Sequence, residues 1–394
     1  MIKKTNTLIP EIRFPEFLNE AEWVENTFEE LFKIGNGRDY KHLGKGEIPV
    51  YGSGGYMLSV NDYLYDGESV CIGRKGTIDK PMFLSGKFWT VDTLFYTHSF
   101  KNCLPKYIHY VFQNINWLKH NEAGGVPSLS KTNIYKIKTL VPKPKEQQKI
   151  ASCLCSLDEL IDAQNKKLHI LKDHKKGLMQ KLFPQEGETV PKYRFPEFVN
   201  DGKWANLKLG EICKITSGGT PNRSTSEFWN GDIPWISTTL IDFNTINQAN
   251  EYITEIGLQN SSAKMFLKGT ILMAMYGQGK TRGKVAILGI EATTNQACAA
   301  IILKKGYNTD YVFQYLAAHY DEIRELSNKG GQENLSGGLI EIIPISIPKP
   351  KEQQKIADCL SSLDALITGQ TQKIQQLKLH KKGLMQGLFP KIND

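Results

Sequence analysis

The stretch PKPKEQQKIASCLCSLDELIDAQNKKLHILKDHKKGLMQKLFP, residues 142–184, decides the fold because the chain contains it twice. Residues 348–390 read PKPKEQQKIADCLSSLDALITGQTQKIQQLKLHKKGLMQGLFP, and 31 of the 43 aligned positions are identical. Each copy opens with prolines, which suit the first turn of a helix, and closes on Leu-Phe-Pro, where proline cannot continue one. Between these ends, apolar residues recur with the 4-3 spacing of a coiled coil. The sequence therefore predicts two long helices, over 143–184 and 349–390.

The apolar seam of each predicted helix has ten positions, of which eight are aliphatic and two are a glutamine and a lysine. A polar residue on such a seam costs stability but fixes the register. Gln164 and Gln370 each lie at the middle of their helix, so we predict an antiparallel pair in which these two glutamines face each other. The alternative, in which each helix packs only on its own domain, stays open. The seams are Ile150, Leu154, Leu157, Ile161, Gln164, Leu168, Leu171, Lys175, Leu178 and Leu182, then Ile356, Leu360, Leu363, Ile367, Gln370, Ile374, Leu377, Lys381, Leu384 and Leu388.

A second, weaker repeat opens each half of the chain. The motif Arg-Phe-Pro-Glu-Phe occurs at 13–17 and at 194–198, and Leu-Ser occurs at 129–130 and at 335–336. Between these anchors the halves differ almost completely, which indicates one architecture that carries two specificities. We predict an α+β fold: two mixed α/β domains, residues 1–142 and 185–348, separated by two long antiparallel coiled-coil helices in a pseudo-twofold tandem repeat. Strands are expected over 69–72, 270–275, 285–288 and 299–303, and helices over 105–119 and 309–328.

The two helices, about 37 residues each, would form a rod of about 55 Å at about 1.5 Å per residue. Such a rod would hold the two domains at a fixed separation, as a ruler does. The net charge of the 394-residue chain is +8, and each repeated segment carries +4 of it. A weakly basic chain is compatible with nucleic-acid binding but does not demonstrate it. Any contact with DNA within the larger domains must therefore come from local clusters.

Glycine-containing loops with cationic and amide side chains provide such clusters. Glycine lets the backbone approach a phosphate closely, while arginine and glutamine read guanine and adenine through paired hydrogen bonds. We expect Arg282→Ala to weaken binding by the second domain alone. The alternative for any single loop, a solvated turn, stays open. The candidate DNA-binding residues are Arg38, Lys41, His42, Tyr51, Ser53, Tyr56, Arg74, Lys75 and Thr77 in the first domain, and Arg223, Trp235, Ser237, Thr238, Tyr276, Gln278, Lys280, Thr281, Arg282 and Lys284 in the second.

Residues 274–281, AMYGQGKT, imitate a nucleotide-binding phosphate loop. However, Ala274 replaces the first glycine, and the segment 285–288 that follows is typical of a strand rather than of the required helix. We therefore expect no ATP site here, and the sequence contains no other motif of catalysis. The seven cysteines are scattered without metal-ligand spacing, so they are expected to be buried thiols. No run of residues is apolar enough for a membrane span or a secretion signal, which favours a cytoplasmic protein without membrane contact.

The order of these motifs resembles the specificity subunits of type I restriction-modification systems, over essentially the entire chain. The resemblance is carried by the paired PKPKEQQKIA and HKKGLMQ stretches, the RFPEF openings, and the loops IPVYGSGG at 48–55 and IGRKGT at 72–77. It implies two target-recognition domains at opposite ends of an antiparallel helix pair, each reading half of a split site in double-stranded DNA. It also implies two methyltransferase subunits and further restriction-translocase subunits as partners. S-adenosylmethionine, ATP and Mg²⁺ would belong to those partners, so this chain is expected to be non-catalytic, with no cofactor or metal of its own.

Two other classes of function remain open from the residues. A stand-alone DNA-binding regulator with two dissimilar domains would bind its site tightly without any methyltransferase. A coiled-coil interaction scaffold would have no salt-dependent affinity for DNA. A self-contained ATPase rests only on the imperfect loop at 274–281 and is the weakest reading.

Overall fold

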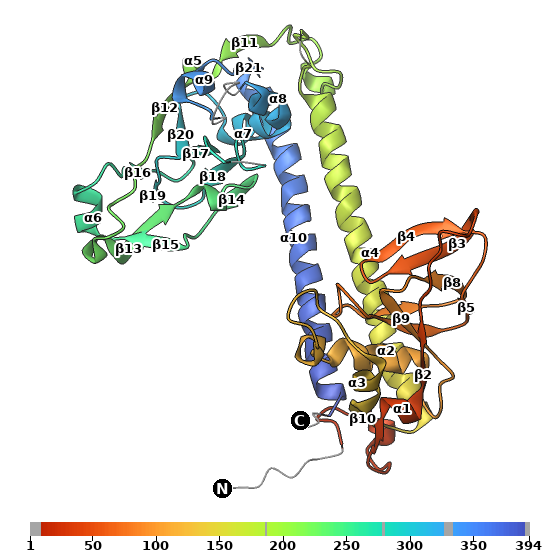
Figure 1. The fold of residues 1–394 in the computed structure, drawn as a ribbon. Helices are drawn as coiled ribbons and strands as arrows, with labels where there is room; N and C mark the ends of the chain where they lie inside the picture. The colour runs from red at the N-terminus through yellow and green to blue at the C-terminus, as the bar shows by residue number, and fades with distance from the viewer. Residues whose placement is uncertain (1–8, 186, 278–279, 327–333, 391–394) are drawn as a thin grey trace. The chain divides into compact units, whose positions relative to one another are not determined.

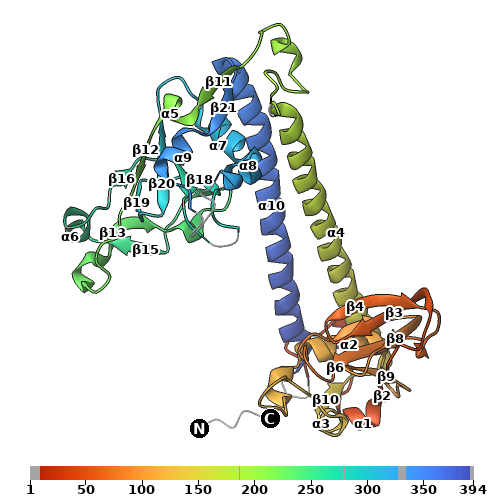
Figure 2. The ribbon, with the colours of Figure 1, turned by 45° about the horizontal axis from the view of Figure 1, so that its top comes forward.

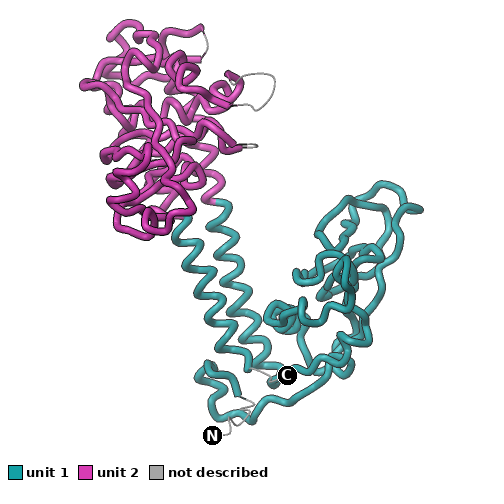
Figure 3. Tube along the Cα trace, turned by 60° about the vertical axis from the view of Figure 1, so that its left-hand side comes forward, with its two compact units in different colours: residues 1–166, 371–394 teal, residues 167–370 magenta. Residues whose placement is uncertain are grey.

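The computed structural model describes residues 9–185, 187–277, 280–326 and 334–390. The chain divides into two compact units, Met1–Lys166 with Thr371–Asp394, and Lys167–Gln370, which we call unit 1 and unit 2 (Figure 3). The two long helices are α4 (Pro144–Leu182) and α10 (Pro350–Leu388), within two residues of the predicted bounds at every end. Each unit therefore contains one globular domain and one part of each long helix.

Within each unit the two long helices pack antiparallel, as predicted. In unit 1 the start of α4 lies beside the end of α10 (Figure 1), and Ile150 and Leu154 of α4 share a buried cluster with Leu388 of α10. In unit 2, Leu182 at the end of α4 shares a cluster with Ile356 near the start of α10. All ten seam positions of each helix are buried or half-buried. Because Gln164 falls in unit 1 and Gln370 in unit 2, their facing each other stays a prediction.

The domain of unit 1 contains two four-stranded sheets. In the second sheet, β3 and β8 run parallel, and every other neighbouring pair in the two sheets is antiparallel. The first sheet has the order β2 (Lys33–Asn36), β9 (Leu94–His98), β6 (Ser69–Gly73), β7 (Met82–Leu84), and the second has the order β4 (Gly55–Val60), β3 (Lys45–Gly52), β8 (Lys87–Thr90), β5 (Tyr65–Asp66).

The domain of unit 2 (Figure 2) repeats this topology strand for strand and adds one edge strand, β14 (Asn244–Ile246), which runs parallel to β18 (Figure 1). Its sheets are β12 (Cys213–Ser217), β20 (Cys298–Leu303), β17 (Ile271–Ala274), β18 (Val285–Leu288) and β14, then β15 (Glu251–Ile253), β13 (Trp229–Ile236), β19 (Ala292–Thr294) and β16 (Met265–Phe266). The parallel pair also recurs, here as β13 and β19. The halves therefore share one architecture despite their different sequences, and the strand β18 replaces the helix that a phosphate loop requires.

Short elements complete each domain. Each domain has an antiparallel two-stranded pair at an equivalent place. In unit 1 it is β1 (Val24–Thr27) with β10 (Lys138–Val141), and in unit 2 it is β11 (Ala205–Lys208) with β21 (Pro344–Ile347). Also equivalent are the short helices α1 (Phe28–Leu31) and α5 (Leu209–Ile212), and the 3₁₀ turns η1 (Pro15–Phe17) and η3 (Pro196–Phe198). The rest are α2 (Pro105–Asn114), η2 (Trp117–His120) and α3 (Lys131–Lys136) in unit 1, and η4 (Ser226–Phe228), η5 (Thr238–Leu240), α6 (Glu255–Gln259), α7 (Thr309–Ala318), α8 (Tyr320–Glu325) and α9 (Gly337–Glu341) in unit 2.

The single helices predicted over 105–119 and 309–328 are each interrupted. Helix α2 ends where Ile115 adopts an extended conformation, and the indole of Trp117 donates to the carbonyl of Phe112 at 2.8 Å, which satisfies one of the helix's last acceptors. In unit 2, His319 leaves the helical region between α7 and α8. These breaks depend on side-chain capping that the apolar pattern does not encode.

Buried ion pairs attach the opening motif of each half to the start of a long helix. The guanidinium of Arg13 donates to both carboxylate oxygens of Glu146 at 2.8 Å, and Arg194 does the same to Glu352. The side chains of Arg13 and Glu146 are only 3% and 2% exposed. The hydrogen bond with Glu146 raises the pKa of Arg13. The Arg-Phe-Pro-Glu-Phe repeat is thus joined to the Pro-Lys-Pro-Lys-Glu repeat by the same ion pair in both halves of the chain.

Candidate nucleic-acid interface

In each domain a short turn joins the two sheets. In unit 1, residues 90–94 lead from β8 in one sheet to β9 in the other, and the amide of Leu94 donates to the carbonyl of Val91 at 2.9 Å. In unit 2, residues 294–298 connect β19 to β20, and the amide of Cys298 donates to the carbonyl of Asn295 at 3.3 Å. We call both segments the inter-sheet turn.

Three loops of unit 1 hydrogen-bond to the inter-sheet turn through their backbones. The amide of Arg38 donates to Thr90 at 2.8 Å, and the carbonyl of Tyr51 accepts from Val91 at 2.9 Å. The amide of Arg74 donates to Thr93 at 2.8 Å. These three loops, 38–42, 51–56 and 72–77, contain all nine candidate residues of the first domain and therefore meet at one place.

The same three contacts occur in unit 2. The amide of Gly219 donates to Thr294 at 2.8 Å, and the amide of Asn295 donates to the carbonyl of Ile236 at 3.0 Å. The amide of Met275 donates to Ala297 at 2.9 Å. We call the three hydrogen bonds between the loops and the inter-sheet turn the backbone frame. Because these bonds use only backbone groups, the loops can carry different side chains while the frame stays the same.

A fourth segment, the repeated Leu-Ser motif, closes this frame in both units. The amide of Leu129 donates to the carbonyl of Arg74, and the amide of Leu335 donates to the carbonyl of Met275, each at 2.9 Å. The following serines, Ser130 and Ser336, cap α3 and α9. The motif recurs in the sequence because it holds the same loop in place twice.

The loops of unit 1 pack closely. A Cβ added at Gly76, where φ is +90°, would lie 3.2 Å from the hydroxyl of Ser53, so the site requires glycine. The indole of Trp89 donates to the carbonyl of Arg38 at 2.8 Å, and the ring of His42 lies edge-on to this indole with 5.8 Å between the centroids. The segment 38–42 is therefore anchored beside the other two loops.

Positive charge gathers on the loops of unit 1. Arg74 and Lys131 lie 6.0 and 5.8 Å from the ring centroid of Phe95. Burial and the charge of Arg74 lower the pKa of Lys131. A cationic surface of this kind suits the phosphates of a nucleic acid. Of the predicted residues, Arg38, Lys41, His42, Tyr56, Arg74 and Lys75 are exposed, and Tyr51, Ser53 and Thr77 are half-buried.

Cations of unit 2 are held by neighbouring side chains. The guanidinium of Arg223 lies 3.9 Å from the ring centroid of Trp229 and 4.7 Å from that of Trp235, and it pairs with Glu251. This pairing raises the pKa of Arg223 and lowers that of Glu251. Lys284 pairs with Asp242 at 2.6 Å. Of the predicted residues, Arg223, Tyr276 and Lys280 are exposed, and Ser237, Thr238, Thr281 and Lys284 are half-buried.

Two predicted contact residues of unit 2 are buried, and a third lies outside the described residues. The side chain of Trp235 is 3% exposed, and its indole donates to Gly219 at 3.0 Å, so it supports a loop from inside. Arg282 is 5% exposed, at the point where the amide of Gly283 bonds to Ala274 and the hairpin closes. Its burial contradicts a direct contact with DNA in this conformation. Gln278 lies outside the described residues.

The sequence reasoning missed the inter-sheet turn itself. Residues 91–93 read Val-Asp-Thr and residues 295–297 read Asn-Gln-Ala, with no residue in common. Asp92 and Gln296 are exposed at equivalent places on these turns. Only Thr90 and Thr294, which precede them, give a shared signal, and one threonine is too little to identify a turn.

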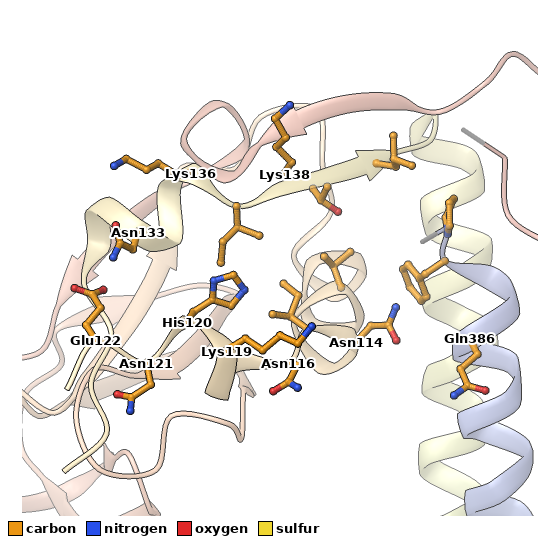
Figure 4. A pocket seen from close by; sticks show the side chains of 17 residues that line it. Asn114, Asn116, Lys119, His120, Asn121, Glu122, Asn133, Lys136, Lys138 and Gln386 are labelled. Atoms are coloured by element: carbon orange, nitrogen blue, oxygen red, sulfur yellow. The ribbon is translucent and has the colours of Figure 1, made fainter. Parts of the chain in front are cut away.

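A cavity of about 970 Å³ lies elsewhere in unit 1, between α2, η2, α3, β10 and the end of α10 (Figure 4). Lys119, His120, Asn133 and Lys136 are among the side chains that line it. Glu122, also in the lining, accepts a hydrogen bond from the amide of Ser130 at 2.8 Å, and hydrogen bonds with Ser130 lower its pKa. None of the lining residues comes from the three loops, so this cavity is separate from the candidate interface.

In the part of the chain that the structure describes, no three His, Cys, Asp or Glu side chains come together to hold a metal ion. Nor does any helix of that part combine the length and the apolar character needed to cross a membrane. Cys71, Cys103, Cys213 and Cys298 are buried as expected, while Cys153, Cys155 and Cys359 are half-buried. Burial raises the pKa of the Cys71 thiol to about 12, so it stays protonated and unreactive.

Comparison with known proteins gives a consistent result. The family model for the type I restriction modification DNA specificity domain matches residues 20–172 and 201–379, once in each half. The MjaIX specificity subunit of Methanocaldococcus jannaschii is 32% identical over 42% of this chain and 38% of its own length. The EcoR124I/EcoR124II specificity subunit of Escherichia coli is 30% identical over 44% of each chain. These two matches span less than half of the relatives, whereas the MjaVIII specificity subunit of M. jannaschii is 26% identical over 84% of this chain and 78% of its own.

The fold also matches solved structures. The S subunit of a type I restriction-modification system from M. genitalium superposes with a TM-score of 0.68 at 15% identity, over 98% of this chain and 100% of its own. A structure described as showing complex assembly and conformational transition of the type I R-M system matches with a TM-score of 0.56 at 14% identity, over 92% and 96%. At these identities the two matches support the fold alone.

Proposed function

The chain belongs to the type I restriction modification DNA specificity family, and on this premise we propose that it selects the DNA target of a type I restriction-modification enzyme. Each domain would read one half of a split site in double-stranded DNA. The antiparallel helices would set the unread gap between the halves. The observation that carries the proposal is the inter-sheet turn, which holds three loops of different sequence on the same backbone frame in both units.

A frame with exchangeable loops is what a reader of variable targets requires. Phosphate contacts position a protein on DNA, whereas side chains on the base edges determine the sequence that is read. In unit 1 the exposed cations Arg38, Lys41, Arg74 and Lys75 would serve both purposes. In unit 2, Lys280, Thr281 and Tyr276 are the corresponding candidates, together with Ser237 and Thr238 beside the turn. Because the family model matches both halves, a stand-alone regulator or a scaffold without DNA is not favoured.

The chemistry would come from partner subunits in the cytoplasm. We propose that this chain is non-catalytic and binds two methyltransferase subunits, which would bring S-adenosylmethionine. Restriction-translocase subunits would bring ATP and Mg²⁺. The long helices offer a repeated surface for this purpose, since Leu160 and Leu366 occupy equivalent positions of α4 and α10 and are 41% and 57% exposed. Two equivalent apolar positions fit two copies of one partner.

The test is to co-express the chain with its cognate methyltransferase and to map the methylated bases in the host DNA. We expect a split motif with two short specific halves and a constant gap. Exchange of residues 185–348 for those of a relative should change one half and keep the other half and the gap. Methylation that is unaltered when this chain is deleted would overturn the proposal.

A further inference from the structure

One exposed polar side chain occupies the same position of the inter-sheet turn in each unit. Asp92 is the first central residue of the turn that the bond from Leu94 to Val91 closes, and Gln296 is its equivalent in the turn from Asn295 to Cys298. Each turn is hydrogen-bonded to all three loops of its domain. These two side chains therefore project from the point at which the candidate contact loops meet.

The amide of Gln296 is held in a defined orientation. The hydroxyl of Thr220 donates to its carbonyl oxygen Oε1 at 2.5 Å, and among the described residues nothing binds the NH₂ group. The carbonyl oxygen keeps a second lone pair, and the NH₂ group can donate. An amide that is oriented in this way can make the paired hydrogen bonds by which glutamine reads adenine.

Asp92 offers only acceptors when it is ionised. Among the described residues it forms no ion pair or hydrogen bond, although the exposed Arg38, Arg74 and Lys75 belong to the loops around its turn. A carboxylate repels DNA phosphates, so at a DNA-facing position it is suited to a base edge rather than to the backbone. Cytosine and adenine both present an amino group in the major groove, and cytosine is the usual partner of a carboxylate because adenine also presents the acceptor N7.

A role in forming the turn does not account for either residue. Aspartate is common in turns, but glutamine is not a typical turn residue, and neither side chain bonds to its own turn. Both turns are closed by backbone bonds that other residue types would also make. The position is thus fixed by the frame, while its side chain differs between two domains that are expected to read different sequences.

We infer that Asp92 and Gln296 are specificity-determining residues at equivalent positions of the two domains. Asp92 accepts a hydrogen bond from a cytosine amino group in the half-site of unit 1, and Gln296 pairs with an adenine in the half-site of unit 2. This inference rests on the proposed function, since it names the bases read by the same interface.

The experiment compares Asp92→Asn and Gln296→Glu with the wild-type chain, each co-expressed with the methyltransferase, by mapping methylated bases in host DNA. Both changes keep the size of the side chain and alter its donors, its acceptors and its charge, and the charge is what the controls below match. We expect discrimination at one base pair to fall by about 5- to 150-fold. For Asp92→Asn this base pair is a C·G pair in the first half-site, and for Gln296→Glu it is an A·T pair in the second. The other half of the motif stays unchanged in each case.

Matched controls change the same groups at a distance from the turn. Asp66→Asn alters an exposed carboxylate beside the start of β8, because Asp66 pairs with Lys87, the first residue of β8. The inter-sheet turn follows the opposite end of this strand. Gln259→Glu alters an exposed amide on α6. Helix α6 follows β15, whose last residue pairs with the first residue of β13. Both controls should give the wild-type motif.

The outcomes separate this inference from the proposed function. If Asp92→Asn and Gln296→Glu methylate the wild-type motif with undiminished stringency, the inference is wrong while the proposed function stands. Methylation that does not depend on the chain at all contradicts the proposed function itself. For a variant that methylates too weakly to map, competition binding of the purified complex to duplexes varied one base pair at a time gives the same measure. Loss of binding to every duplex by a folded variant also overturns the inference, because a base-reading residue affects one base pair.

Discussion

The ammonium of Lys381 on α10 lies 2.6 and 2.8 Å from the two carboxylate oxygens of Asp158 on α4. The hydroxyl of Tyr110 on α2 donates to the same carboxylate at 3.0 Å, so the contact joins both long helices to the domain of unit 1. In unit 2, Lys175 and Asp364 form the equivalent pair at 2.6 Å, and Gln314 on α7 takes the place of the tyrosine. Each lysine is the charged seam position that the sequence analysis identified.

Reversal of one charge in this contact should destabilise unit 1. Lys381→Asp alone would place two carboxylates together, as Asp158→Lys alone would place two ammonium groups, and we expect each to lower the free energy of unfolding by about 1–3 kcal/mol. The double variant should recover most of the loss. Thermal unfolding measures the effect, and amide hydrogen exchange locates it. Equal loss of protection in unit 2, whose own pair is intact, would contradict the assignment.

The predicted glutamine contact can be tested by cross-linking. Alignment of the helix midpoints brings Gln164 level with Gln370, whereas a shift by one seam step brings it level with Ile374. We expect Gln164→Cys to cross-link faster with Gln370→Cys than with Ile374→Cys, since a disulfide forms only across a short Cα separation. Oxidation in a chain with serine at Cys153, Cys155 and Cys359, read by non-reducing electrophoresis, measures the two rates. The reverse order would contradict the midpoint alignment.

The extent to which the sequence predicted this structure follows from where its regularities lie. A 4-3 repeat over ten seam positions leaves few alternatives to a long helix, so α4 and α10 agree with their predicted bounds. The frame that unites the loops is made of backbone bonds, such as those from Arg38 to Thr90 and from Gly219 to Thr294, and backbone bonds leave no residue signature. The sequence also does not show whether a cation is exposed, and for this reason Arg282 was wrongly predicted to lie on the surface.

The buried pair of Arg13 and Glu146 should matter far more than an exposed pair of the same domain. Arg13→Met would leave a 2% exposed carboxylate without its partner, and we expect a loss of about 3–5 kcal/mol in the free energy of unfolding. Lys138 and Glu25 pair at 2.8 Å but are 57% and 45% exposed, so Lys138→Met should cost about 0–1 kcal/mol. Urea denaturation of the two variants measures the difference. Similar losses would show that burial does not govern these pairs.

His109 should make unit 1 sensitive to acid. Burial and the charge of Lys381 lower the pKa of this histidine to about 4, from about 6.5 in an unfolded chain. At a pH between these two pKa values, the imidazole of His109 binds a proton in the unfolded state but not in the folded state. The free energy of unfolding therefore falls as the pH falls through this window, by about 1–3 kcal/mol.

Unit 2 supplies the control for this titration, because it has Phe313 at the equivalent position of α7. We expect His109→Phe to flatten the loss of stability between pH 6.5 and pH 4 and to leave the slope above pH 7 unchanged. Thermal unfolding at a series of pH values compares the two chains. Identical profiles would indicate that other groups dominate in this range.

Leu160 and Leu366 should contribute equally to binding of the two methyltransferase subunits, because they occupy equivalent positions of the repeated helices. Leu160→Asp and Leu366→Asp place a charge where an apolar partner surface would cover it, which should weaken one docking site by about 30-fold each. Native mass spectrometry of the co-expressed complex should then show one bound methyltransferase for each single variant and none for the double variant. Leu379→Asp is the matched control: Leu379 is 68% exposed, and its counterpart in the first helix is Asp173, so an aspartate is already accepted at that position. Two bound methyltransferases in the double variant would move the docking surface away from this face of the helices.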